Sequence, residues 1–134
     1  MTDRIARYFG AGAAGGFLNS MVVWLFGSLG LSAALGVAIA PHLSPGWLYP
    51  RVVWGGIWGV LLFLPVCPIR PWLRAFLLSL GPTLVQLLIV FPLKAGKGMA
   101  GIDLGLLTPL LVIFFNWVWG VTALFFSSEF SRRN

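Results

Sequence analysis

Long apolar stretches alternate with short polar connections along almost the whole sequence. Four of them approach or reach the roughly 20 residues that an α-helix needs to cross the hydrocarbon core of a bilayer. The pattern therefore predicts an all-α polytopic integral membrane protein, a four-helix transmembrane bundle that forms a single domain over residues 1–134. The predicted spans cover about residues 8–30, 52–69, 72–92 and 104–126.

A shorter apolar stretch at residues 31–40 follows the first predicted span. As a helix it would be only about 15 Å long, half of what a crossing needs. Leu31, Leu35 and Ile39 recur at i, i+4 and i+8, which gives the helix one larger apolar face, and Pro41 ends it. The stretch is either an interfacial helix or a re-entrant arm, and its one-sided face favours the interface.

Composition changes the picture by excluding a water-soluble globule. Of the 134 residues, 59% are hydrophobic and 9% are charged, whereas an ordinary soluble domain has about 25% charged residues. The net charge of +6 would suggest nucleic acid in a soluble protein. Here the basic residues lie between apolar stretches, where they orient a membrane protein instead. We therefore expect a lipid bilayer around the chain and no nucleic-acid partner.

The distribution of Lys and Arg predicts the orientation of the chain. With four crossings, both termini and the connection between the second and third spans share one side, whose six basic residues are Arg4, Arg7, Arg70, Arg74, Arg132 and Arg133. The other side has three, Arg51, Lys94 and Lys97, with Arg51 expected as an interfacial anchor before the second span. Because basic residues are retained in the cytoplasm, we expect both termini there, in the cell (inner) membrane.

Small residues share a face within the predicted spans. At 100° per residue, the small and polar residues of the first, third and fourth spans each fall within an arc of about 100°. Lipid does not drive helices together, so close contact depends on small residues that let the backbones approach. The predicted packing glycines are Gly12, Gly16, Gly55, Gly59, Gly105 and Gly120.

The same faces carry the polar side chains of the spans, and they predict an intramembrane polar cluster. Its expected members are Asn19, Ser20, Thr83, Gln86 and Asn116. An unbonded amide in hydrocarbon costs several kcal/mol, so these side chains should face one another. Three interpretations follow: hydrogen-bonded glue between helices, a polar path or pocket for a small neutral or anionic solute, or an interface with another polypeptide.

Catalytic and metal-binding residues are scarce. The chain has one His, one Cys and three carboxylates, two of which lie near its ends. No acid, base, nucleophile or metal set can be assembled from these residues at recognisable spacing. We therefore expect no enzymatic activity, no metal site and no cofactor.

Asp3 and Glu129 lie near the ends of the chain. The third carboxylate, Asp103, lies next to a predicted span. It is expected to cap the start of the fourth span and to meet the positive end of its helix dipole. The alternative is a charged cluster on the non-cytoplasmic side, in which Asp103 pairs with Arg51, Lys94 or Lys97 as part of a gate.

Four short spans bury little surface between themselves, so self-association or a membrane-protein partner is expected. The sequence thus favours a non-enzymatic multi-pass membrane protein that acts through helix packing, as a subunit or small homo-oligomer. The alternative is a small solute or ion channel or transporter with a polar path at Asn19, Gln86 and Asn116.

Overall fold

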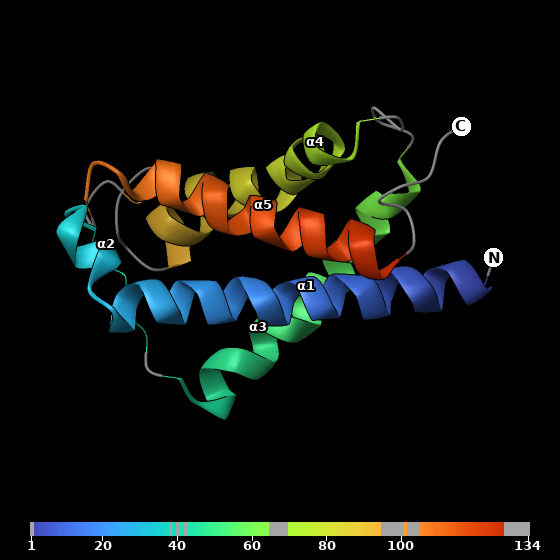
Figure 1. The fold of residues 1–134 in the computed structure, drawn as a ribbon, viewed down its shortest axis with the longest axis horizontal. Helices are drawn as coiled ribbons and strands as arrows, with labels where there is room; N and C mark the ends of the chain where they lie inside the picture. The colour runs from blue at the N-terminus through green and yellow to red at the C-terminus, as the bar shows by residue number, and fades with distance from the viewer. Residues whose placement is uncertain are drawn as a thin grey trace.

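The computed structural model describes residues 2–37, 39, 41, 43–64, 70–94, 101 and 105–127. Within these residues every regular element is helical, as Figure 1 shows. Two of the longer helices change type near their C-terminal ends, α3 into a 3₁₀ helix (η1) and α4 into a π-helix (η2). The elements are α1 (Thr2–Ser28), α2 (Leu31–Ala34), α3 (Pro45–Trp58), η1 (Gly59–Phe63), α4 (Pro71–Val85), η2 (Gln86–Lys94) and α5 (Thr108–Phe126).

Helix α1 is the centre of the arrangement. It packs against α3 on one side and α5 on another, and α5 packs in turn against α4. Residues early in α1 contact residues late in its neighbours: Gly12 lies against Trp119 of α5, and Tyr8 lies against Gly59 at the end of α3. Each packed pair is therefore antiparallel, and consecutive long helices alternate in direction.

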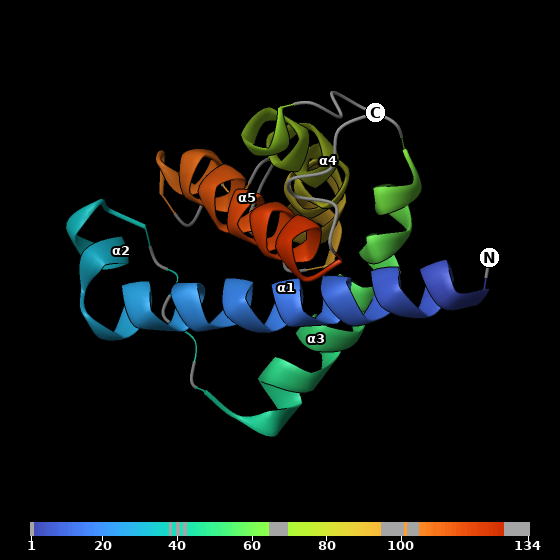
Figure 2. The same ribbon diagram turned by 45° about the vertical axis from the view of Figure 1, so that its right-hand side comes forward.

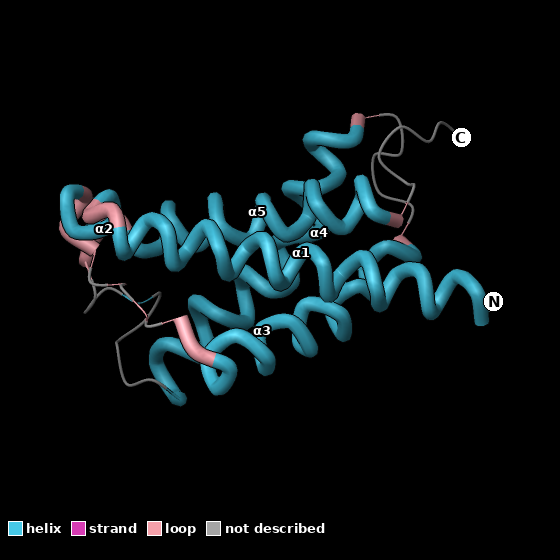
Figure 3. The backbone as a smooth tube through the Cα atoms, turned by 60° about the horizontal axis from the view of Figure 1, so that its bottom comes forward, coloured by secondary structure: helices cyan, strands magenta, loops and turns pink. Residues whose placement is uncertain are grey.

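Four glycines form the contact between α1 and α3, which Figure 3 shows lying close along one another. A Cβ on Gly55 would stand 2.7 Å from the carbonyl oxygen of Gly12 and 2.8 Å from the Cα of Gly16. A Cβ on Gly12 would collide with the carbonyl oxygen of Gly55 and stand 3.0 Å from the Cα of Gly59. The two backbones are thus in direct contact, which only residues without a side chain permit.

The indole of Trp119 joins three helices. Its Nε1 donates to the carbonyl oxygen of Gly12 at 3.1 Å and to that of Gly55 at 3.2 Å. Trp119 is 3% exposed, and the next residue of α5, Gly120, packs against the backbone of Ala75 in α4. The polar end of one buried aromatic side chain therefore bridges α5 to the glycine contact of α1 and α3.

The segment at residues 31–40 differs from the expected ten-residue helix. Helix α2 covers only Leu31–Ala34, because Gly36 takes a left-handed backbone conformation with φ +75°. The N–H of Val37 then donates to the carbonyl of Ser32 at 2.9 Å, and that of Gly36 to Ala33 at 3.0 Å, which is the Schellman pattern of a helix end. The i, i+4, i+8 face is not continued.

Two predicted span boundaries are corrected by local geometry. Helix α3 begins at Pro45 rather than near residue 52, because the side chain of Ser44 accepts a hydrogen bond from the N–H of Trp47 at 3.3 Å and Pro45 occupies the first turn. Helix α5 begins at Thr108, so Gly105 is not part of a helical packing stripe. Gly105 has φ +147° and a Cβ there would collide with the carbonyl of Gly36.

Among the described residues, three helices are long and apolar enough to cross a membrane: Asp3–Ser28, Pro71–Val90 and Thr108–Phe126. Many large apolar side chains on them are exposed, such as Leu25 on α1, Leu84 on α4 and Phe125 on α5. A membrane protein presents such side chains to lipid. The helical content and these three segments support the membrane assignment.

The glycine contact predicts opposite effects for two neighbouring substitutions. Gly12→Ala should lower the free energy of unfolding by about 1–3 kcal/mol, because its methyl group meets rigid backbone. Gly10→Ala is the matched control: a Cβ there meets nothing within 4 Å, and Ala raises helix propensity by up to about 1 kcal/mol. Thermal unfolding followed by circular dichroism in mild detergent measures both. Equal midpoints for the two variants would contradict the contact.

Candidate functional site

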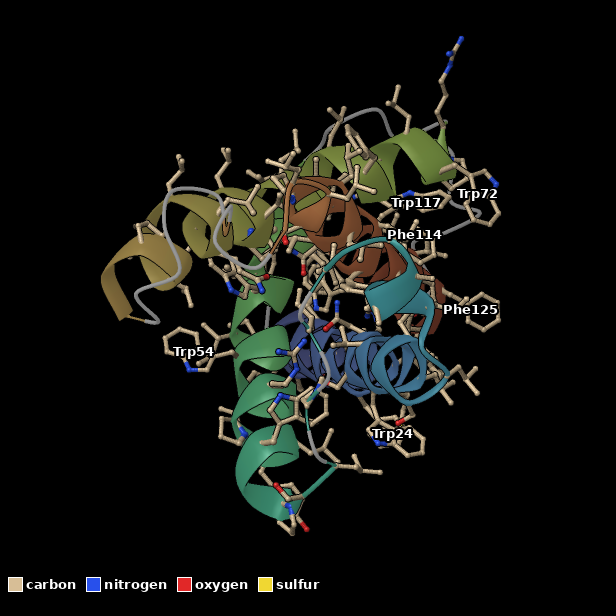
Figure 4. All side chains as sticks on the ribbon, turned by 90° about the vertical axis from the view of Figure 1, so that its left-hand side faces the viewer. Trp24, Trp54, Trp72, Phe114, Trp117 and Phe125 are labelled. Carbon is tan, nitrogen blue, oxygen red and sulfur yellow. The ribbon has the colours of Figure 1, made fainter. Side chains whose placement is uncertain are left out.

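Polar side chains from four helical segments meet in the interior of the described structure. Figure 4 views the molecule from one end, where nitrogen and oxygen atoms gather in the space between the helices. Four members are buried, namely Asn19, Ser20, Thr83 and Asn116. Gln86, the first residue of η2, is partly buried. The structure therefore brings the five residues of the predicted polar cluster to one place.

Arg51 of α3 is a sixth member of this cluster. Its Nη2 donates to Oδ1 of Asn19 at 2.7 Å, and its Nε donates to Oγ of Ser20 at 2.8 Å. Ser20 itself donates to the carbonyl of Gly16 at 2.7 Å, which leaves its oxygen free to accept from Arg51. The guanidinium carbon also lies 4.8 Å from the ring centre of Trp47, a cation–π contact.

The amides form a row with one direction. Arg51 can only donate, so the oxygen of Asn19 faces it, and the Asn19 nitrogen donates onward to the carbonyl of Phe115 at 2.5 Å and to Oδ1 of Asn116 at 3.5 Å. The nitrogen of Asn116 then donates to Oγ1 of Thr83 at 3.1 Å and to Oε1 of Gln86 at 3.4 Å. The oxygen of Asn19 thus accepts from Arg51, and the oxygen of Asn116 accepts from Asn19.

The partners of Arg51 in the described part of the chain are all neutral. They are an amide oxygen, a hydroxyl oxygen and an indole ring. Asp3, the one carboxylate among the described residues, lies in the first turn of α1, far along the helix from Asn19 and Ser20. Neutral oxygens stabilise a guanidinium but do not cancel its charge, so the positive potential extends into the neighbouring space.

That neighbouring space is a cleft of about 530 Å³. Its polar wall is formed by Asn19, Arg51, Gln86 and Asn116. The remaining walls come from α3 on one side and from α4 and η2 on the other. They are mainly apolar and aromatic and include Pro50, Trp54, Trp58, Pro82, Val85, Ile89 and Val90.

The sequence predicts Arg51 as an interfacial anchor, with a charged cluster of Arg51, Lys94, Lys97 and Asp103 only as the alternative to the capping role of Asp103. The structure places Arg51 beside Asn19, near the middle of the first predicted span, because α3 begins seven residues earlier than the hydropathy pattern indicated. The Ser44-Pro45 pair, an N-cap followed by proline, was the signal that could have shown this. Residues 97 and 103 and the side chain of residue 94 lie outside the described part of the chain.

Two substitutions separate the charged contact from the neutral ones. Asn19→Leu removes the acceptor of Arg51, and we expect a loss of about 1.5–3 kcal/mol of unfolding free energy, the range for hydrogen bonds to charged groups. Asn116→Leu removes only neutral bonds between helices, worth about 0.6 kcal/mol each. Unfolding in mixed detergent micelles measures both values. A larger loss for Asn116→Leu than for Asn19→Leu would contradict this assignment.

Comparison with known proteins assigns no family to the chain. No protein-family model, no curated protein and no solved structure matches it. What the site can do is therefore argued from its own residues: one guanidinium held by neutral oxygens, a directed row of amides, and an apolar cleft beside them.

Proposed function

We propose that the chain crosses the membrane four times. Helix α3 alone is too short for a crossing, and together with η1 it is long enough to provide one. The α-helical part, Pro45–Trp58, is about 21 Å long. The 3₁₀ part, Gly59–Phe63, adds about 10 Å because its rise per residue is larger. Together they match the roughly 30 Å of a bilayer core, and the alternating helix directions agree with four successive crossings.

The proposed orientation places both termini in the cytoplasm, in a cell (inner) membrane. At the end of the molecule where α1 begins, Nε of Arg7 donates to the carbonyl of Ser127 after α5, and Nη2 of Arg74 donates to the carbonyls of Leu62 and Leu64 after α3. With Arg51 in the interior, two of the three basic residues that the sequence assigns to the opposite side, Lys94 and Lys97, remain in that count. The excess of basic residues on the side of the N-terminus is therefore larger than the sequence count indicates, which favours a cytoplasmic N-terminus more strongly.

The function that this geometry supports best is the binding and passage of an anionic solute by a non-enzymatic membrane protein. The observation that carries the proposal is Arg51, a cation that lines the cleft at the depth of Asn19 and has neutral partners in the described residues. Charged residues within membrane segments are costly and mark the paths of ions and substrates. An anion in the cleft would supply the charge that the neutral oxygens do not.

The amides give such a site a second property. The oxygen of Asn19 accepts from Arg51, the nitrogen of Asn19 donates to the oxygen of Asn116, and the nitrogen of Asn116 donates to Thr83 and Gln86. An anion that approaches from the Gln86 side would exchange a hydrogen bond with amide donors before it reaches the guanidinium. The polar wall of the cleft therefore offers successive donors, as a path for an anion requires.

A second candidate is the helix-packing subunit or small homo-oligomer. It is favoured by the hydrogen bonds of the cluster, which link α1 to α3 and α5, and α5 to α4, entirely within the chain. On this view the cluster is glue, and the exposed apolar faces meet lipid, a second copy or another membrane protein. It predicts a fixed oligomer or a co-purifying partner and no solute movement.

Uptake by proteoliposomes tests the proposal. The purified chain should move anions from a panel that runs from chloride and phosphate to carboxylates of increasing length, and Arg51→Gln should reduce uptake at least about tenfold, as expected for the loss of a charged hydrogen bond. Arg70→Gln, which removes the same charge from an exposed position, should leave uptake unchanged. Uptake no faster than in protein-free liposomes for every anion would refute the proposal.

A further inference from the structure

We propose that the anion held by Arg51 is the headgroup of a single-chain amphiphile, such as a long-chain carboxylate, whose alkyl chain lies along the apolar walls of the cleft. The inference rests on the proposed function, since it takes Arg51 as the anion-binding group, and it adds the class of ligand and its route. The ligand enters sideways from the bilayer, between α3 and η2.

The cleft has two kinds of wall, one polar and one apolar. The polar groups are gathered on one wall, where hydrogen bonds join Arg51, Asn19 and Asn116, while Trp54, Ile89 and their neighbours line the rest. A hydrophilic anion is best bound by donors on several sides, and most of this surface could not donate to it. A molecule with one charged end and one apolar end matches both walls at once.

The cleft lies between helices and is open on one side. The main helix contacts join α1 to α3, α1 to α5, and α4 to α5. Figure 2 shows the N-terminal half of α3 diverging from the rest of the bundle. In Figure 4 Trp54 projects from α3 toward the side on which η2 lies. Trp54 is 59% exposed and Ile89 49%, so the apolar walls continue onto the outer surface, where a bilayer would be.

The backbone at this opening is unusual on both sides. Pro50 interrupts the hydrogen bonding of α3, Pro82 that of α4, and both line the cleft. Beyond Pro82 the chain continues as the π-helix η2, which supplies Gln86, Ile89 and Val90. π-Helical turns are rare and occur frequently at functional sites. The opening is thus built from the least regular parts of both helices.

Size and charge fix the class of occupant further. A volume of about 530 Å³ lies within the range of pockets that take one small ligand. The cleft has one cation and, among the described residues that line it, no carboxylate. One negative charge on one alkyl chain satisfies both conditions, whereas a phospholipid would have to leave its second chain outside the cleft.

The experiment uses the full-length protein in nanodiscs of zwitterionic lipid, with palmitate that carries bromine on its chain as the probe. Bromine quenches a nearby indole, so a ligand in the cleft should quench tryptophan fluorescence in a saturable manner. Unlabelled palmitate should reverse the quenching. Hexadecanol, which has the chain without the charge, and acetate, which has the charge without the chain, should each compete at least tenfold less well.

Matched variants locate the ligand. Trp54→Phe combined with Trp58→Phe should remove most of the saturable quenching, because both indoles line the cleft. Trp24→Phe should leave it unchanged, because Trp24 projects from α1 on a different side of the molecule, as Figure 4 shows. Arg51→Gln should weaken binding at least tenfold and Arg51→Lys, which retains the charge, should restore most of it. The competition series in the unaltered protein requires no variant to fold.

The outcomes separate this inference from the proposed function. Equal competition by hexadecanol, or competition by phosphatidylglycerol as strong as that by palmitate, overturns the single-chain anionic ligand. Uptake of small anions that depends on Arg51, together with no saturable quenching by bromo-palmitate, overturns the inference and leaves the proposed function standing. No binding and no uptake of any anion overturns both.

Discussion

The contact of the Arg51 guanidinium with Asn19 and Ser20 is the constraint on which the rest of the structure depends. It requires α3 to approach α1 so closely that an arginine of one helix reaches two adjacent side chains of the other. The glycines at the crossing make that approach possible, because any Cβ on Gly55 would meet the backbone of α1. Packing and electrostatics are therefore coupled. Without the direct contact between the backbones of α1 and α3, the guanidinium of Arg51 would lose the oxygens of Asn19 and Ser20.

The sequence predicted the helical class and the face on which the polar residues of α1, α4 and α5 lie. Both follow from local regularities, hydropathy and the 100° step of the helix, and Asn19, Thr83 and Asn116 are brought together as such a face requires. It did not predict the place of Arg51. A search for uncharged stretches begins a span after a charged residue, whereas the helix itself begins at its cap, Ser44.

Other differences arose where backbone conformation overrides side-chain pattern. The apolar spacing after α1 indicated a helix of ten residues. The helix ends earlier because Gly36 has a positive φ, and a hydropathy pattern does not reveal backbone conformation. The changes to 3₁₀ and π geometry at Gly59 and Gln86 are likewise not indicated by the hydropathy pattern. The number of membrane crossings and the ligand of the cleft depend on the chain in its bilayer. A local sequence pattern therefore does not predict them.

The common polarity of the amide row has a consequence for how the two halves of the molecule communicate. Asn19 is oriented by Arg51, and Asn116 is oriented in turn by Asn19. If a ligand drew the guanidinium away, the oxygen of Asn19 would lose its charged donor, while the amide nitrogens would still be held by the carbonyl of Phe115 and by Thr83 and Gln86. Occupancy at α3 would then loosen the row at its Arg51 end and leave its far end anchored at Thr83 and Gln86, with no helix displaced.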